Sequence, residues 1–419
     1  MYQCDKGIRK TAERCGTTVV VACAAMLLAG CVVSGSPVPF TSQLATLEVG
    51  RYPAEPPPEP HGSDEKYGRV VESVRMGEAV IDPVEADPDL AFGPPAGAQP
   101  LPAPAKTLGL LAAPTRTVLE QRGMLAGFSV TASDRNLSTG PIVGASRLLT
   151  VVLLRFPDAE AARQAAQEID SADAAVNTDN VPLAVPGFAQ ARAHWRPAVP
   201  TLAATMAHES MVISLLVGHT APDASALGAL AGRAFTAQLA RLKSFVPTPR
   251  DRFATLPLDR DGMLRRLVPE RPGGWPYPVV AELGTGPHAG WASTVWASGV
   301  VFGPHAVRLR GARPRTVPTV ELGAVSGHSS LARYPTAAVA RRAVESEDGI
   351  GPLRRAAAAP KGLPEAVCAE RIDLQESFAK YECRIHYGRY LARVAGRDLV
   401  RTQQKTAAQY ALLVASGPG

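Results

Sequence analysis

The spacing of hydrophobic positions changes several times along the chain, and each spacing predicts a different element. Residues 147–155 and 211–217 are short, continuous apolar runs, which are typical of buried strands, and residues 189–195 predict a third strand. Asp158 follows the first run. We expect it to cap a helix that continues to about residue 169, because its carboxylate accepts a first-turn N–H at the positive end of the helix dipole. Helical spacing over residues 221–245 predicts a second helix.

The segment before these elements has a mixed pattern. Residues 47–50 predict a short strand, which a proline-rich stretch follows. Apolar residues alternate with charged ones over residues 67–81, which predicts an amphipathic helix that stops at Asp82-Pro83. Residues 92–106 are rich in Gly, Pro and Ala and predict a loop.

The C-terminal part has the same order of elements. Residues 331–335 open a predicted helix over 336–346, strands follow at 366–371, 381–386 and 389–394, and a helix over 399–414 ends the chain. Residues 155–165 and 333–343 also match closely in residue type and spacing. We therefore predict an α+β fold made of two duplicated units, each an antiparallel sheet with helices packed on one face. Chance likeness between two helices rich in Ala and Arg is the alternative.

These patterns divide the chain into five parts. They are a signal peptide (1–30), a tether (31–45), a first α+β unit with an N-terminal extension (46–246), a connector (247–330) and a second α+β unit (331–419). The connector is rich in Gly and Pro, with one strand-like stretch at 299–309.

The N-terminus predicts export. Basic residues precede an apolar run over residues 17–28, and Leu28-Ala29-Gly30-Cys31 closes the run. The run is too short to cross a bilayer, which needs roughly 20 residues, and the whole pattern is that of a secretory signal. The ending resembles a bacterial lipobox, in which the Cys thiol receives a diacylglyceryl group and becomes the new N-terminus. Cys31 is thus the expected lipid attachment site, on the outer face of the cell membrane. An ordinary signal peptide cut near Gly30 is the alternative.

Two cysteines remain in the body of the mature chain, Cys368 and Cys383. They lie symmetrically about an expected turn at residues 374–377, so they would face each other across two paired strands. Exported proteins can oxidise such pairs, and we predict a disulfide between them. Two buried free thiols are the alternative.

Composition narrows the function classes only slightly. The net charge is +6, and about +4 without the signal peptide, with no basic stripe that would favour nucleic acid. Weak attraction to anionic lipid or cell-wall polymer remains open. Aromatic residues make up 5% of the chain.

Catalytic motifs are not found. No Gly-x-Ser-x-Gly elbow is present, and Ser63-x-x-Lys66 and Ser377-x-x-Lys380 lack the partner motifs of acylating enzymes. His288, His305 and His328 share the connector and are the best candidate for a metal site, although no carboxylate spacing supports one and surface histidines are the simpler interpretation. We assign no catalytic, metal or cofactor residue.

The connector aromatics are the remaining candidates for ligand contact. Trp275, Tyr277, Trp291 and Trp296 lie near Gly and Pro and could form a stacking floor for a sugar or an apolar ligand. The simpler interpretation is that they pack the connector onto the sheets.

Several of these features together resemble a known family. They are the lipobox, residues 47–53, residues 75–88 with Met76-Gly77-Glu78, the stretch Val301-Phe302-Gly303-Pro304-His305, and the two Cys-containing strands. This set is similar to a family of exported actinobacterial lipoproteins of mycobacteria, nocardiae and rhodococci that carry a duplicated domain of unknown function. The resemblance implies location and architecture and brings no activity.

The sequence therefore favours a membrane-anchored envelope lipoprotein that binds a ligand or an envelope partner without catalysis. A cell-wall or lipid hydrolase or transferase, with a site assembled from distant residues, is the alternative. A purely structural or sensor-like module is a third.

Overall fold

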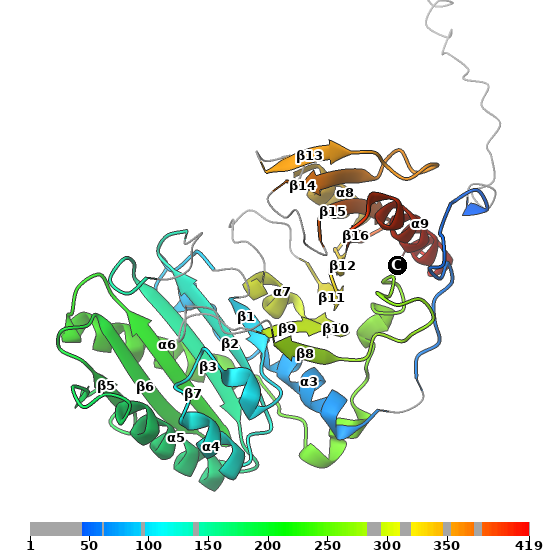
Figure 1. Ribbon diagram of the computed structural model, residues 1–419. Helices are drawn as coiled ribbons and strands as arrows, with labels where there is room; N and C mark the ends of the chain where they lie inside the picture. Colours follow the sequence, from blue (N-terminus) through cyan, green and yellow to red (C-terminus); the bar gives the residue numbers. More distant parts are fainter. Residues whose placement is uncertain are drawn as a thin grey trace, which may run out of the picture. The chain divides into compact units, whose positions relative to one another are not determined.

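The computed structural model describes residues 44–60, 63–93, 97–136, 142–282, 295–310, 320–346, 353–372 and 379–418. Residues Leu47–Gly419 form one compact unit (Figure 1), and the following description concerns the described residues of that unit. The signal peptide and Cys31 lie outside the described residues, as do Trp291, His288, Ser377 and the turn expected at 374–377.

The first half of the chain forms an antiparallel sheet. In the described residues its strands follow the order β1-β2-β3-β7-β6-β5-β4. These strands are β1 (Ala98–Pro100), β2 (Ala126–Ser133), β3 (Leu148–Arg155), β4 (Val181–Pro182), β5 (Arg192–Trp195), β6 (Thr201–His208) and β7 (Met211–Gly218). The helices of this half are α3 (Glu65–Met76), α4 (Thr115–Gln121), α5 (Ala159–Ala174) and α6 (Ala224–Leu242), with short 3-10 turns at Pro83–Glu85 and Pro104–Thr107.

The second half builds a sheet of the same topology. Its described strands follow the order β10-β11-β12-β16-β15-β14-β13. They are β10 (Val300–Phe302), β11 (Leu322–Ser326), β12 (Ser329–Arg333), β13 (Arg354–Ala357), β14 (Val367–Arg371), β15 (Tyr381–Tyr387) and β16 (Tyr390–Gly396). The helices are α7 (Pro304–Arg310), α8 (Ala337–Ser346) and α9 (Leu399–Ala415). Before them come 3-10 turns at Arg250–Thr255 and Arg260–Gly262 and a separate hairpin of β8 (Val279–Glu282) and β9 (Val295–Ser298).

The two strand orders can be superimposed element by element, from β1 on β10 to β4 on β13. The helices keep the same places: α4 and α7 follow the first strand of each sheet, α5 and α8 follow the third, and α6 and α9 come last. The expected duplication of an α+β unit is therefore confirmed. The residues assigned to the connector include β10, α7 and β11, which belong to the second sheet.

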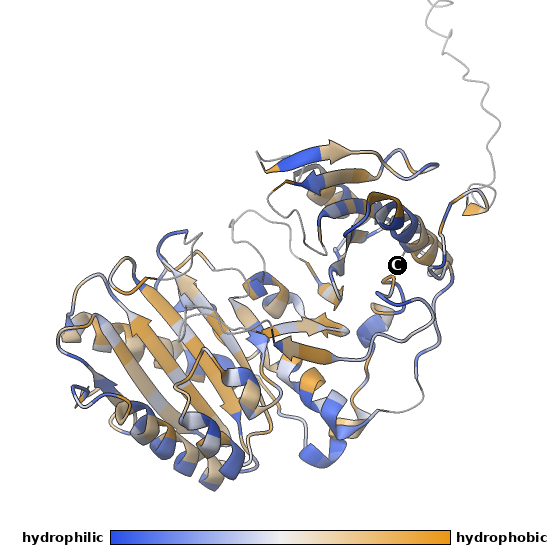
Figure 2. Cartoon of the chain, viewed as in Figure 1, coloured by the Kyte–Doolittle hydropathy of each residue, from blue (hydrophilic) through white to orange (hydrophobic). Residues whose placement is uncertain are grey.

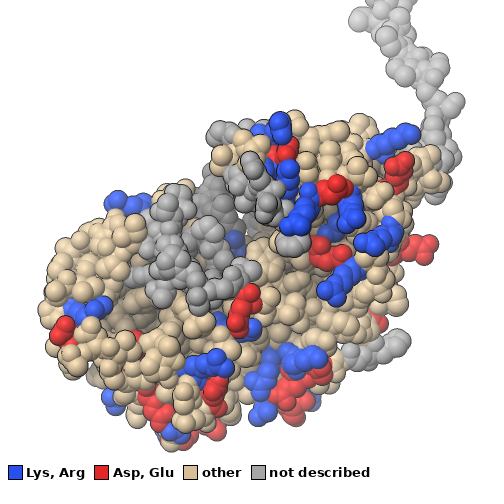
Figure 3. Space-filling model, viewed as in Figure 1, with Lys and Arg blue, Asp and Glu red and all other residues tan. Residues whose placement is uncertain are grey.

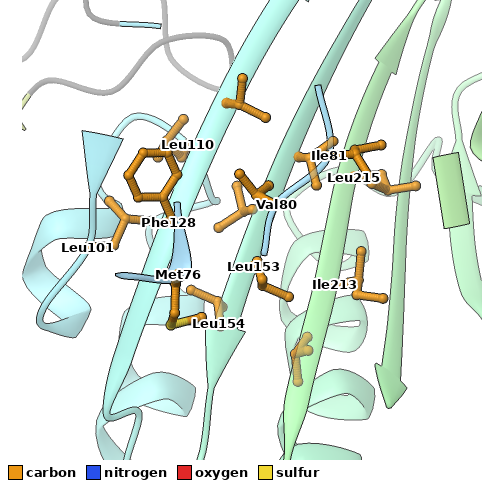
Figure 4. Packing of buried hydrophobic residues seen from close by; sticks show 14 of the residues in the cluster. Met76, Val80, Ile81, Leu101, Leu110, Phe128, Leu153, Leu154, Ile213 and Leu215 are labelled. Carbon is orange, nitrogen blue, oxygen red and sulfur yellow. The ribbon is translucent and has the colours of Figure 1, made fainter. Parts of the chain in front are cut away.

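The larger hydrophobic core lies against the first sheet. Phe128 pairs with Leu153 and Leu153 with Ile213 across three neighbouring strands, so their side chains line one face (Figure 4). Met76 and Val80 pack over this row. Every residue of β2 and β3 is buried, and the strands are mostly hydrophobic (Figure 2), so both faces are covered and not one face alone. Each large side chain buried in this way contributes about 1.5–3 kcal/mol.

Part of the expected connector completes this core. Seven of its described apolar residues belong to the same cluster of buried side chains as β2 and β3. They are Val280, Val295, Ala297, Val300, Phe302, Ala306 and Leu309. The segment is therefore a packed component of the fold and not only a link between the units.

A buried glutamine in the last helix of each half binds a short backbone segment that lies outside the helices and strands. Gln238 of α6 accepts a hydrogen bond from the Ile81 N–H (3.1 Å) and donates one to the Ala79 carbonyl (2.7 Å). The side-chain amide thus makes the pair of bonds that a neighbouring strand would make. It satisfies two backbone groups that are costly to bury alone.

Gln409 of α9 repeats this contact in the second half. It accepts from the Val268 N–H (2.9 Å) and donates to the Arg266 carbonyl (2.6 Å), the same i and i+2 pattern. Both glutamine side chains are completely buried. We call the two contacts the glutamine clamps.

Several elements match their sequence-based expectations. The apolar runs at 147–155 and 211–217 are β3 and β7. Helices α6 and α8 lie within their expected ranges, and α9 ends one residue beyond its expected range. Asp158 caps α5, and its carboxylate accepts from the Ala161 N–H at 2.8 Å. Strands β2 and β6 were not anticipated by the hydrophobic pattern.

Four expectations at element boundaries are wrong. The helix over 67–81 ends at Met76, because Gln238 binds the Ala79 carbonyl and the Ile81 N–H, which a longer helix would use in its own hydrogen bonds. Residues 92–106 are not all loop: they include β1, whose Pro100 is tolerated because β1 is an edge strand. The stretch 299–309 divides into β10 and α7 at Gly303. Residues 331–335 do not open a helix, because β12 continues to Arg333.

The expected strand at 47–50 is also wrong. The described residues there make no ladder pairing, and the Val49 N–H instead bonds the Leu47 carbonyl (3.1 Å). Leu47 and Val49 pack against the smaller core of the second half. Their alternation therefore reflects burial of one side of the segment without a partner strand.

The disulfide prediction is confirmed. Cys368 of β14 lies directly opposite Cys383 of β15 in the antiparallel register, and the two are bonded. Cys383 is fully buried and Cys368 nearly so, so the bond lies within the sheet.

Replacing Gln238 with Leu should strongly destabilise the protein. The Ile81 N–H and the Ala79 carbonyl would stay buried without a partner, and each such group costs about 1–3 kcal/mol. We expect a marked fall in the urea midpoint, measured by circular dichroism. Gln167→Leu, on the exposed side of α5, is the control and should change stability by no more than about 0.5 kcal/mol. Equal midpoints for both variants would contradict the clamp.

Replacing Cys368 and Cys383 together with Ala should lower the free energy of unfolding by roughly 3 kcal/mol, because the bond closes a short loop in the unfolded chain. The loop follows from a sequence separation of 15 residues. Thiol alkylation of the unfolded wild type, followed by mass spectrometry, should label neither cysteine until a reductant is added. Labelling of both before reduction would show that the bond is absent.

Candidate functional site

Two stretches that carry the family resemblance contact each other. Gly77 and Glu78 follow α3, and Gly303 and His305 surround the start of α7. A Cβ on Gly77 would lie 2.8 Å from the Ala306 Cβ, and a Cβ on Gly303 would lie 2.6 Å from a Glu78 carboxylate oxygen. The first distance requires glycine at position 77, and a side chain at position 303 would displace the Glu78 carboxylate from its present place. We call this contact the Glu78–His305 junction.

Glu78 holds the first turn of α7. Its carboxylate accepts from the backbone N–H groups of His305 (3.2 Å) and Ala306 (2.9 Å). These amides have no partner within a helix, and a carboxylate there also interacts favourably with the helix dipole. The residue therefore acts as a helix cap supplied by a distant part of the chain.

His305 is fixed at both ring nitrogens. Nε2 lies 2.8 Å from the Val80 carbonyl and so donates, while Nδ1 lies 2.9 Å from Arg308 Nη2 and accepts. Burial lowers the pKa of His305, and the positive charges of Arg241 and Arg308 add to the effect. The ring is therefore neutral at pH 7, and both nitrogens are occupied by the protein.

The three connector histidines have different surroundings. His305 lies in the junction, His328 lies in the turn between β11 and β12, and His288 is outside the described residues. The backbone N–H of His328 donates to Glu270 at 3.1 Å. In the part of the chain that the structure describes, no group of three His, Cys, Asp or Glu side chains is arranged to hold a metal ion.

The described connector aromatics are held separately. Trp275 is half-buried against the second core, and its indole N–H is buried without a hydrogen-bond partner among the described residues. Trp296 donates from Nε1 to the Gly327 carbonyl at 3.3 Å. Tyr277 is 41% exposed and stacks on Tyr67 of α3, with ring centroids 4.8 Å apart. Of these side chains, Tyr277 offers the most surface to a ligand.

A completely buried carboxylate, Glu72 of α3, was not singled out from the sequence. It pairs with Arg155 at 2.6 Å and with Arg75, and it accepts from the Thr248 N–H (3.0 Å) and hydroxyl (2.7 Å). Burial lowers the pKa of Arg155, and the charge of Glu72 opposes that shift. The Glu72 carboxylate thus accepts from four donors, and these bonds connect α3 to β3 and to the segment after α6. The only sequence signal was an acidic residue on the apolar side of a helix.

The two Ser-x-x-Lys stretches make no acylating pair among the described residues. Lys66 forms an ion pair with Asp64 at 3.2 Å, and Lys380 forms one with Glu370 at 3.4 Å. Ser63 donates weakly to the Asp64 carbonyl, and Ser377 lies outside the described residues. Each lysine is thus engaged with a carboxylate.

Charges on the surface are mixed. On the face shown in Figure 3, Lys and Arg side chains lie beside Asp and Glu side chains over much of the described surface. None of the described helices combines the length and the apolar character needed to cross a membrane.

Comparisons with known proteins identify a family without a known role. The N-terminal model of the domain of unknown function DUF7373 matches residues 59–258, and its C-terminal model matches residues 263–416. The two matches correspond to the two halves of the fold.

Among solved structures, the chain is similar to the extracellular domain of PknH from Mycobacterium tuberculosis, with 12% identity and a TM-score of 0.27, over 40% of this chain and 96% of that chain. At that score the likeness carries no argument. A comparison with curated proteins finds no match. Because the two family models together span most of its length, the chain belongs to the DUF7373 family of domains of unknown function.

Proposed function

We propose that this chain is a lipid-anchored protein on the outer face of the cell membrane, which binds a ligand or an envelope partner and catalyses no reaction itself. The observation that carries the proposal is the disulfide between Cys368 and Cys383. Disulfides persist in oxidising compartments and are rare in the cytosol. An exported chain is therefore the best account of a bonded pair inside the second sheet.

The N-terminal sequence supports the same location. The basic start, the short apolar run and Leu28-Ala29-Gly30-Cys31 fit a lipoprotein signal. A second acyl chain at the new N-terminus would make attachment stable, because a single chain binds membranes only marginally. The resemblance to exported actinobacterial lipoproteins points to the same place.

The state of the buried ionisable groups favours binding over catalysis. Glu72, Glu78 and His305 each use their polar atoms to hold backbone or charged partners within the fold. A general acid or base needs a polar atom within reach of a substrate proton. Glu72, Glu78 and His305 instead stabilise the described part of the fold, which can then hold a binding surface in a fixed shape.

Replacing Cys31 with Ala should release the protein from the membrane. Mass spectrometry of wild type purified from host membranes should find an acylated Cys31 at the N-terminus. The matched control is Cys23→Ala, a cysteine that leaves with the signal peptide, and this variant should remain anchored. A wild-type chain that begins beyond Cys31 and carries no lipid would make the protein a secreted one and contradict the anchor.

A photo-reactive phenylalanine analogue at position 277 should capture a partner in intact cells. Tyr277 is exposed and its ring is fixed by stacking on Tyr67, which suits a contact residue. We expect a discrete cross-linked product from position 277. The same analogue at Val176, which is 60% exposed after α5, should give none. The same products from both positions would count against a specific surface at Tyr277.

A further inference from the structure

We propose that the guanidinium of Arg310, at the end of α7, is a binding site for an oxyanion, namely a carboxylate or phosphate group of a ligand. The site gives a chemical class to the ligand in the function proposed above and in that sense rests on it. α7 lies beside β1 (Figure 1), and the site is made by these two elements and β10.

The guanidinium is held from two sides. Nη1 donates to the Ala98 carbonyl (3.0 Å) and to Oε1 of Gln99 (2.7 Å), both in β1. Its Cζ lies 4.2 Å from the centroid of the Phe302 ring, so the plane of the group also packs on an aromatic side chain. A side chain with several rotatable bonds is thereby fixed before any ligand arrives, which lowers the entropy cost of binding.

The opposite edge of the guanidinium has no partner among the described residues. Neither Nε nor Nη2 makes a hydrogen bond there. These two N–H groups are parallel and spaced to match the two oxygens of a carboxylate or phosphate. Arg310 as a residue is only partly buried, and this edge is where an oxyanion would bind.

The positive charge of Arg310 is not balanced by the protein. No Asp or Glu side chain of the described residues forms an ion pair with it, whereas its neighbour Arg308 lies 3.9 Å from Asp82. Burial alone lowers the pKa of Arg310 to about 10, so the group stays charged at pH 7. A buried charge without a counter-charge is costly, and a bound anion would remove that cost.

The duplicated half supplies an internal comparison. Arg122 is the C-cap residue of α4, and Arg310 is the last residue of α7, the helix with the same place in the chain order of the second unit. Arg122 donates from Nε to Glu168 of α5 at 2.8 Å, from Nη2 to the other oxygen of that carboxylate, and from Nη1 to Gln164. In the first unit, a carboxylate thus occupies the fork of the matching arginine.

The aligned positions of the second unit carry no carboxylate in the sequence. The match of residues 155–165 with 333–343, continued along the helix, places Arg342 and Ser346 of α8 at the positions of Gln164 and Glu168. In the sequence, those positions hold a cation and a hydroxyl residue in place of the two acceptors. An oxyanion from outside the chain can therefore bind the free edge of Arg310 in the way that Glu168 binds Arg122.

The test measures anion binding by the full-length chain in a non-ionic detergent. Thermal unfolding is followed against sodium phosphate and sodium acetate, with sodium chloride keeping the ionic strength constant. We expect a saturable rise in the unfolding midpoint with at least one of the two oxyanions, beyond any effect of chloride. Cosedimentation with phosphatidylglycerol vesicles, compared with phosphatidylcholine vesicles, separates a lipid headgroup from a free anion as the source.

Three variants decide the outcome. Arg310→Met should weaken the oxyanion effect at least tenfold, and Arg310→Lys should also weaken it, because an ammonium keeps the charge but not the fork. Arg308→Gln removes the same charge two residues away on an exposed side chain and should change the affinity less than twofold.

The proposal would be overturned if wild type and Arg310→Lys showed the same oxyanion-dependent midpoint shift and the same vesicle binding. It would also be overturned if Arg308→Gln weakened the oxyanion effect as much as the Arg310 variants do. If Arg310→Met does not fold, the lysine variant still decides. The measurement needs neither Cys31 acylation nor a protein partner, so its failure is distinct from failure of the anchor.

Discussion

The glutamine clamps are the constraint on which the duplicated architecture depends. In each half, a helix at the end of the unit reaches back to a short irregular segment near its start, and the side-chain amide makes two hydrogen bonds to the backbone of that segment. The segments at 79–81 and 266–268 have no strand beside them to do this. Because a buried amide must satisfy its own donors and acceptor as well, the contact is specific in position and direction.

The first clamp also positions the junction. Gln238 fixes the backbone on either side of Val80, and the Val80 carbonyl accepts from His305. Glu78, two residues earlier, caps α7, and α7 carries Arg310 to β1. One polar side chain in α6 therefore orders a series of contacts that leads from the first core to the second sheet. This explains why apolar residues from 295–309 are found in the core of the first half.

The sequence revealed the parts of the fold whose cause is local. Asp158 lies next to the helix that it caps, the run at 147–155 is largely apolar, and Cys368 and Cys383 are symmetric about an expected turn. No local sequence pattern indicates the clamps, because a single Gln in an Ala-rich helix is normally expected to face solvent. The repeat does not reveal them either: Gln238 is one helical turn farther from its cap, Asp223, than Gln409 is from Asp398. The contacts of the junction join positions more than two hundred residues apart, which no local spacing can indicate.

Duplication also shows where the two halves have diverged. Residues needed for folding tend to recur in both copies, as the clamps do, because each copy must pack the same arrangement of helices and strands. A residue that recurs while its partner does not has lost its structural reason in that copy. Arg122 keeps Glu168, and its charge is neutralised within the first unit. Arg310 is held by β1 and by the Phe302 ring, but it forms no ion pair with an acid of the described residues. Its hydrogen bonds to β1 use only one edge of the guanidinium, so a ligand that pairs with the other edge explains the unbalanced charge better than packing alone.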